Sequence, residues 1–192
     1  FKFVLSNFAD PALPPVCYGV SGTYQAFMYD GSSFTFLPTG MAIDRPSHLA
    51  VHENRLFLAF EGSLQFSALN DPTDWNVVVG AGEIATGSKI TGLLSVTGSE
   101  GASALLVSTE TRLFVLYGAA VDEFRLIQLS ENTGALPKSI QWIGQPVFQN
   151  MFGITMLSTS DRYGGFEESA ISSAVKPFLD ERRSRATASM IC

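Results

Sequence analysis

Residues 55–59 have the sequence Arg-Leu-Phe-Leu-Ala, and residues 65–76 have the sequence Gln-Phe-Ser-Ala-Leu-Asn-Asp-Pro-Thr-Asp-Trp-Asn. The first run predicts an apolar β-strand, and the second predicts a short strand that ends in a turn rich in Asn, Asp and Pro. Two related pairs of runs follow, at 104–108 with 112–118 and at 145–148 with 153–157. Strand pairs that recur along a chain predict a repeated antiparallel sheet, such as the blade of a β-propeller.

The spacing of these pairs is uneven. Leu56 and Leu113 are 57 residues apart, whereas Leu113 and Ile154 are 41 residues apart. A blade of four strands needs roughly 40–50 residues. The longer interval therefore predicts a loop insertion within residues 62–90.

Turn signals predict two hairpins. Residues 25–29 and 34–37 flank Asp30-Gly31, and the glycine supplies the positive φ that a tight turn requires. Residues 48–52 and 55–59 flank Glu53 and Asn54 in the same way. Further strands are expected at 77–79, 90–96, 105–108, 113–117 and 124–129.

One segment has helical spacing. Residues 167–182 begin with acidic side chains and end with basic ones, which suits the helix dipole. Its apolar positions are Ile171, Val175, Phe178 and Leu179. Because Pro177 would kink or split a helix, we expect one or two short helices near residues 167–183.

The expected fold is thus mainly β, with antiparallel, blade-like sheets of a partial β-propeller. Residues 1–40 are expected to form an N-terminal β segment with a hairpin, and residues 41–192 the blades. The sequence stops at Cys192 within a β-like run, which predicts that the blades are incomplete and that the chain is a fragment. No apolar run reaches the ~18 residues that a membrane-spanning helix needs, so no integral membrane segment is expected.

The charge is acidic and unevenly distributed. The chain has 12 Lys and Arg against 18 Asp and Glu, a net charge of −6; four of the basic residues but only two of the acidic ones lie in 171–192. An acidic bulk argues against a general nucleic-acid groove and suits a passage for DNA better than a binding site. Cys17 and Cys192 lack metal-ligand spacing, and two unpaired thiols are typical of a reducing cytoplasm.

The candidate catalytic and metal-binding residues favour structural roles. On a strand, His48 and His52 would lie ~13 Å apart, too far to share a metal ion, even with Glu53 nearby. Asp71 and Asp74 are better explained as turn residues that accept backbone N–H groups than as an acid pair. The remaining candidates, Ser67, Ser108, Ser158 and the Gly-rich residues 80–85, lack the setting of a hydrolase nucleophile or a dinucleotide fingerprint. We therefore expect no enzyme, no metal and no cofactor.

Two groups of residues have open alternatives. Trp75 and Trp142 would each pack one end of a blade, with a binding platform as the alternative. Asp71, Pro72, Asp74 and Trp75 together form the expected structural turn. Arg182, Arg183 and Arg185 would be the solvated end of a helix or would contact a neighbouring subunit or DNA.

The run at 66–75 resembles a phrase found in phage virion proteins that have a β-propeller core. Other segments fit the same proteins in the same order, at 45–57, 90–94, 113–118, 131–140 and 146–154. Over about residues 40–192, the chain is similar to the tail nozzle family (tail tubular protein B) of short-tailed bacteriophages, with related stabilisation proteins under the portal.

This resemblance implies a structural subunit without enzymatic activity. Its expected partners are further copies of itself in a ring, the tail adaptor and other tail proteins, and genomic DNA that passes non-specifically through the channel. Its expected place is the virion tail, after synthesis in the host cytoplasm, with a part in DNA retention and ejection. The alternative is an all-β binding module, such as a receptor- or carbohydrate-binding propeller. Exposed aromatic side chains around a polar pocket would favour that alternative, and a ring with an acidic lumen would favour the tail.

Overall fold

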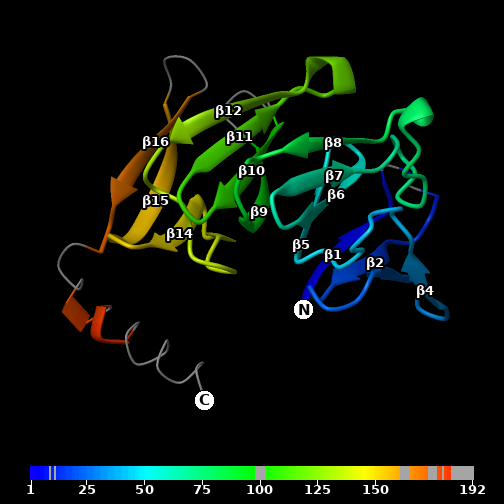
Figure 1. Cartoon of the computed structure of the whole chain (residues 1–192), viewed down its shortest axis with the longest axis horizontal. Helices are drawn as coiled ribbons and strands as arrows, with labels where there is room; N and C mark the ends of the chain where they lie inside the picture. The colour runs from blue at the N-terminus through cyan, green and yellow to red at the C-terminus, as the bar shows by residue number, and fades with distance from the viewer. Residues whose placement is uncertain are drawn as a thin grey trace.

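The computed structural model describes residues 1–8, 10, 12–97, 103–160, 165–172, 177–178 and 180–182. Its strands form four antiparallel sheets of four strands each, and every sheet uses four consecutive strands of the chain (Figure 1). The prediction of a mainly β chain with blade-like antiparallel sheets is confirmed.

We number the sheets in chain order. Sheet 1 contains β1 (Lys2–Ser6), β2 (Val16–Val20), β3 (Ala26–Tyr29) and β4 (Phe34–Leu37). Sheet 2 contains β5 (His48–His52), β6 (Arg55–Phe60), β7 (Ser63–Phe66) and β8 (Gly82–Ala85). Sheet 3 contains β9 (Ile90–Thr97), β10 (Ser103–Thr109), β11 (Leu113–Tyr117) and β12 (Arg125–Ser130). Sheet 4 contains β13 (Gln141–Trp142), β14 (Pro146–Asn150), β15 (Gly153–Ser160) and β16 (Gly165–Ala170).

Sheet 2 is buried on both faces, which explains its uninterrupted apolar run. Successive side chains of a strand point to opposite faces. On β6, Leu56 and Leu58 pack in a core with sheet 1, whereas Phe57 and Ala59 pack in a core with sheet 3. The same strand therefore joins two hydrophobic cores.

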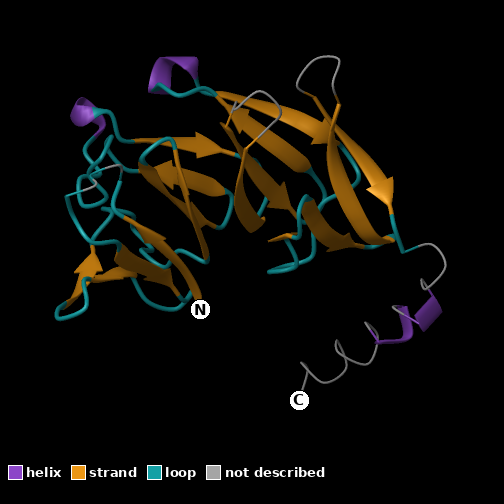
Figure 2. Cartoon of the chain, turned by 180° about the vertical axis from the view of Figure 1, so that it is seen from behind, coloured by secondary structure: helices purple, strands orange, loops and turns teal. Residues whose placement is uncertain are grey.

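Sheet 3 repeats this arrangement. On β10, Leu105 and Val107 belong to the core shared with sheet 2, and Leu106 belongs to the core shared with sheet 4. The sheets thus stack face to face in chain order, and Figure 2 shows them following one another across the molecule. The first strands of sheets 1, 2 and 3 lie next to one another, because β5 contacts both β1 and β9.

The predicted hairpins and the predicted insertion are confirmed. Strands β3 and β4 pair around a turn in which Gly31 has a φ of 100°, and β5 and β6 pair around Glu53 and Asn54, which have φ values of 46° and 52°. The insertion lies between β7 and β8, where the chain leaves sheet 2 for residues 67–81.

The helix prediction is wrong for its first part. Residues 167–170 belong to β16, whose backbone pairs with β15, so the sheet ladder overrides the helical spacing of the side chains. Residues 177–178 and 180–182 are helical. Of the expected apolar helix face, Ile171 and Phe178 are exposed, and Val175 and Leu179 lie outside the described residues.

The strand expected at 77–79 is also wrong. Val77–Val79 forms a short 3-10 helix, η1, and a second one, η3, spans Val121–Glu123. The side chain of Asn76 accepts a hydrogen bond from the Val78 N–H at 3.0 Å, and Gly80 ends η1 with a left-handed φ of 92°. This cap and this terminator outweigh the β propensity of three valines.

Candidate functional site

The Asp-Pro-Thr-Asp-Trp loop is a structural turn. The Asp71 carboxylate accepts hydrogen bonds from the Thr73 hydroxyl at 2.6 Å and the Thr73 N–H at 2.9 Å, and these bonds hold the pKa of Asp71 below its ordinary value. The Asp74 carboxylate accepts from the Asn76 N–H at 2.9 Å. Each carboxylate accepts hydrogen bonds from the residues that follow it, on either side of Pro72 in the chain. The two groups therefore have separate partners, unlike the two carboxylates of a catalytic acid pair, which share a proton.

The two tryptophans have different environments. Trp75 is half-buried and packs against the core between sheets 1 and 2, with a buried Nε1 that has no hydrogen-bond partner among the described residues. Trp142 is 51% exposed on the two-residue strand β13 at the edge of sheet 4. The expectation that each tryptophan packs the end of a blade is therefore wrong for Trp142, because an edge strand of two residues leaves a ring of that size uncovered.

A buried arginine fixes the long loop to sheet 2. The Arg55 guanidinium donates hydrogen bonds to the Ser67 carbonyl at 2.8 Å and the Gly80 carbonyl at 2.7 Å, which lie near the two ends of the 67–81 loop. It also lies 5.7 Å from the centre of the Phe66 ring. Burial lowers the pKa of Arg55, and no carboxylate lies within 4.0 Å of it in the described part of the chain. Sequence reasoning missed this role, since an arginine at the start of a strand carries no local signal of its distant acceptors.

His48 and His52 lie on β5 in a buried setting, and they have different partners. His48 Nδ1 lies 2.9 Å from the Ser47 hydroxyl, whereas His52 Nδ1 lies 3.4 Å from the Ser95 hydroxyl. Burial, followed by the positive charge of nearby lysines, lowers the pKa of His48 to about 4; burial also lowers the pKa of His52. Glu53 contacts the Ser103 hydroxyl. Within the described residues, no three His, Cys, Asp or Glu side chains are placed to hold a metal ion.

The candidate serines are structural where their contacts are described. The buried Ser67 hydroxyl accepts from the Leu56 N–H at 3.1 Å and donates to the Ala68 carbonyl at 3.0 Å. The buried Ser108 hydroxyl lies 3.1 Å from the Thr91 hydroxyl. Ser158 lies half-buried on β15. Of the Gly-rich residues 80–85, Gly80 ends η1 and Gly82–Ala85 forms β8, so a strand stands where a dinucleotide site would need a helix.

The C-terminal arginines are only partly described. Arg182 is exposed, and its guanidinium lies 5.1 Å from the centre of the Phe178 ring. Arg183 and Arg185 lie outside the described residues. Cys17 is a free, half-buried thiol on β2, and Cys192 is likewise outside the described part.

The outer face of sheet 1, which points away from sheet 2, carries an aromatic surface that sequence reasoning missed. Ring centres are 6.1 Å apart for Phe1 and Phe3, 6.1 Å for Phe3 and Phe27, 4.7 Å for Phe27 and Phe34, and 5.3 Å for Phe34 and Phe36. Four of these side chains, all except Phe27, are exposed, with Phe3 at 60% and Phe34 at 56%. We call these five rings the aromatic face. The alternation of Phe1 with Phe3 and of Phe34 with Phe36 was its available signal.

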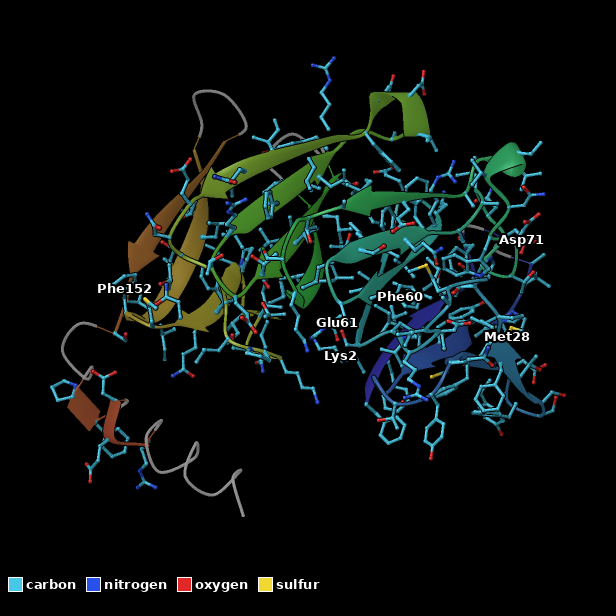
Figure 3. The ribbon with its side chains drawn as sticks, in the orientation of Figure 1. Lys2, Met28, Phe60, Glu61, Asp71 and Phe152 are labelled. Atoms are coloured by element: carbon cyan, nitrogen blue, oxygen red, sulfur yellow. The ribbon has the colours of Figure 1, made fainter. Side chains whose placement is uncertain are left out.

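A shallow depression of about 200 Å³ lies on this face. It is lined by Phe1, Ser21, Tyr24, Gln25, Phe27, Phe34 and Phe36. The Ser21 hydroxyl oxygen accepts from two backbone N–H groups, and the Gln25 amide donates to Asp44 at 3.1 Å. Met28, which Figure 3 labels, is on the same strand as Phe27 but packs into the core between sheets 1 and 2.

Across the described residues, no helix has both the length and the apolar character to cross a membrane. Comparison of the sequence with protein-family models and with curated proteins finds no match in either case.

Proposed function

We propose that this chain is a structural component of a phage tail, a subunit of the nozzle ring around the DNA channel that takes part in DNA retention and ejection. The observation that carries the proposal is the position of the family-like phrases on the sheets. Residues 45–57 lead into and include the first hairpin of sheet 2, residues 90–94 start sheet 3, and residues 131–140 link sheet 3 to sheet 4. Residues 66–75 cover the end of β7 and the loop after it, residues 113–118 include β11, and residues 146–154 include β14 and the start of β15. The phrases therefore recur, in order, on sheets 2, 3 and 4, although at different positions within each sheet.

The stacking of the sheets supports the propeller part of this proposal. The sheets share apolar faces in chain order, and the first strands of sheets 1, 2 and 3 are adjacent. These are the neighbour relations of propeller blades. The aromatic face of sheet 1 has no cover in the described structure, and a contiguous exposed apolar surface is typical of an interaction site. A subunit of a ring needs such surfaces.

The charge distribution supports a passage that does not hold DNA. In each sheet, the loop that joins the first to the second strand and the loop that joins the third to the fourth lie at the same end of that sheet, and we call these loops together the acidic loops. Their described acidic residues are Asp10, Asp30, Glu53, Asp71, Asp74, Asp122 and Glu123. Among the described residues of these loops and the strand ends beside them, only Arg55, which is buried, and Arg125 are basic. Like charge repels DNA within a screening length of ~8 Å at physiological salt.

The test is the assembly state of the protein together with its tail adaptor. We expect electron microscopy and sedimentation to show a ring, and gel shifts to show no sequence-specific DNA binding. A protein that stays monomeric with the adaptor present, or that selects one DNA sequence, would contradict the proposal.

The aromatic face favours a second candidate, an all-β binding module. The Ser21 hydroxyl oxygen and the Gln25 amide nitrogen already have partners within the chain, while the exposed Tyr24 also lines the depression and carries a hydroxyl that a sugar could use. The five phenylalanine rings themselves offer no polar group, which suits an apolar protein surface better than a carbohydrate. A glycan that binds the purified protein and is lost in Phe34→Ala would favour the binding module instead.

A further inference from the structure

The apolar surface of sheet 1 extends beyond the five rings of the aromatic face. The strand register pairs Leu5 with Cys17, Cys17 with Tyr29, and Tyr29 with Phe34, and the side chains of directly paired residues lie on the same side of a sheet. Leu5 is 69% exposed, and Tyr29 is also exposed. This row therefore continues the aromatic face across all four strands.

The strands of sheet 1 place no charge on this side. Lys2 is the only Asp, Glu, Lys or Arg residue in β1 to β4. It alternates with Phe3, so it lies on the other side of the sheet, together with Val4, which packs against the core between sheets 1 and 2. The Tyr29 hydroxyl donates to the Gly31 carbonyl at 2.8 Å. A partner that covered this side with charged groups would lose their hydration without gaining a hydrogen bond.

The face carries both a depression and projecting side chains. Phe27 lies against Gly19, its pairing partner on β2, so closely that the ring leaves no room for a Cβ at that position. The same ring lines the depression of about 200 Å³, whereas Phe3 and Leu5 stand outside its lining and are exposed. A surface that binds a second copy of itself must be self-complementary, and a projection beside a depression provides this.

The exposed area of the face is close to one side of a stable dimer interface. Six aromatic residues on this side are exposed: Phe1, Phe3, Tyr24, Tyr29, Phe34 and Phe36. Their exposed fractions correspond to roughly 700 Å² of surface, at about 200 Å² for a whole aromatic side chain. An interface of standard size buries about 800 Å² on each partner, whereas the largest apolar patch of a typical monomer is about 300–600 Å².

The other end of the series of sheets offers a poorer match. Figure 1 places sheets 1 and 4 at opposite ends. On β15, Leu157 belongs to the core shared with sheet 3, so Ile154, Met156 and Ser158 lie on the outer side of sheet 4. All three are half-buried, and one of them is polar. The best apolar match that the described chain offers to the aromatic face is therefore the same face of another copy.

We infer that two copies of this chain pair through the outer side of sheet 1, aromatic face against aromatic face, about a two-fold axis. Sheets that pack face to face lie ~10 Å apart and interdigitate their side chains. Because both copies use the same patch, the contact closes at two copies. The inference does not rest on the proposed tail function. If that function holds, the pair and the ring compete for one face, so the pair forms in the absence of the tail adaptor.

The first test is sedimentation equilibrium of the protein alone over a range of concentrations. We expect a reversible equilibrium between monomer and dimer without larger species. Phe3→Lys should raise the dissociation constant of the dimer roughly a hundredfold, because the substitution occurs in both copies and each charge placed in the apolar contact costs about tenfold. Its thermal midpoint should change little, since Phe3 is 60% exposed.

The matched control is Met156→Lys, the same kind of change on the outer side of sheet 4. Gln149→Lys is a milder second control, because Gln149 pairs with Ile154 and lies on that side as well. Both controls should dimerise like the wild-type protein. A wild-type protein that stays monomeric at every concentration, a series of larger oligomers, or equal losses in a folded control would overturn the inference.

The second test locates the contact by hydrogen exchange at low and high protein concentration. Exchange in sheet 1 should slow with concentration in the wild-type protein and not in Phe3→Lys. Slowing confined to sheet 4 would overturn the inference. Ring assembly with the adaptor is measured separately. A dimer that is lost in Phe3→Lys, with no ring, would support the pair and contradict the tail function, and a ring from a wild-type protein that is monomeric alone would do the reverse.

Discussion

Individual buried polar residues determine how the loops are tied to the sheets. Arg55 joins the ends of the 67–81 loop through two carbonyl groups, and a hydrogen bond to a charged donor is worth about 1.5–3 kcal/mol. These bonds are made inside the protein, where solvent competes little. The position of the loop therefore depends on a residue outside it.

Replacing Arg55 should lower the stability of the protein. We expect Arg55→Met to reduce the free energy of unfolding by about 2–4 kcal/mol, because two carbonyls lose their donor while the apolar volume is kept. Urea denaturation measures the change. Arg112→Met, at an exposed turn residue of sheet 3, is the control and should shift stability by less than about 0.5 kcal/mol. Equal effects of the two changes would show that the Arg55 contacts contribute nothing specific.

His48 should make the protein less stable in mild acid. Its pKa falls from 6.5 to about 4 on folding, so the unfolded chain binds a proton that the folded chain resists. The stabilisation is present above pH 6.5 and is lost as the pH falls toward 4, to a total of about 3 kcal/mol. His48→Gln should flatten the stability profile between pH 6.5 and 4. An unchanged slope in that variant would exclude His48 as its source.

At the level of strands and loops, the prediction succeeded where the signal is local. The apolar run of β6 and the turn residues Gly31 and Asn54 encode their own conformation, so both hairpins were found. The prediction failed where pairing with another strand determines the conformation. Residues 167–170 have helical spacing of apolar side chains, but their backbone pairs with β15 and forms a strand. The role of Arg55 and the aromatic face were missed for the same reason, since each brings together residues from separate segments of the chain.

The two tryptophans provide a matched pair for testing the packing of the 67–81 loop. Trp75 is half-buried against a core, so Trp75→Ala should cost about 1–3 kcal/mol, less than for a fully buried ring. Trp142→Ala, at an exposed site on the edge strand β13, should cost less than about 0.5 kcal/mol. The measurement is the thermal unfolding midpoint of each variant compared with that of the wild-type protein. A midpoint unchanged by Trp75→Ala would show that Trp75 contributes no packing energy to the loop.

For the molecule as a whole, sheet 1 stands at the end of the series of stacked sheets and presents an apolar face to the outside. Between sheets 1 and 2, 2 and 3, and 3 and 4, apolar side chains meet and are buried. The aromatic face is also apolar but has no cover in the described structure. Its exposure is therefore costly for an isolated chain and favourable for an assembled one.

This asymmetry predicts that the aromatic face is needed for assembly and not for folding. Phe34→Lys combined with Phe36→Lys should leave the thermal midpoint nearly unchanged, because both rings are exposed and their removal uncovers no core. In sedimentation with the tail adaptor that we propose as its partner, the double variant should remain monomeric, since a charge placed in an apolar interface must lose its water. The control is Val78→Lys, which adds a charge at a valine 90% exposed on η1, away from this face, and should assemble normally. Assembly of the Phe34 and Phe36 double variant at wild-type strength would show that the ring forms through other surfaces, and the aromatic face would then belong to a separate binding function.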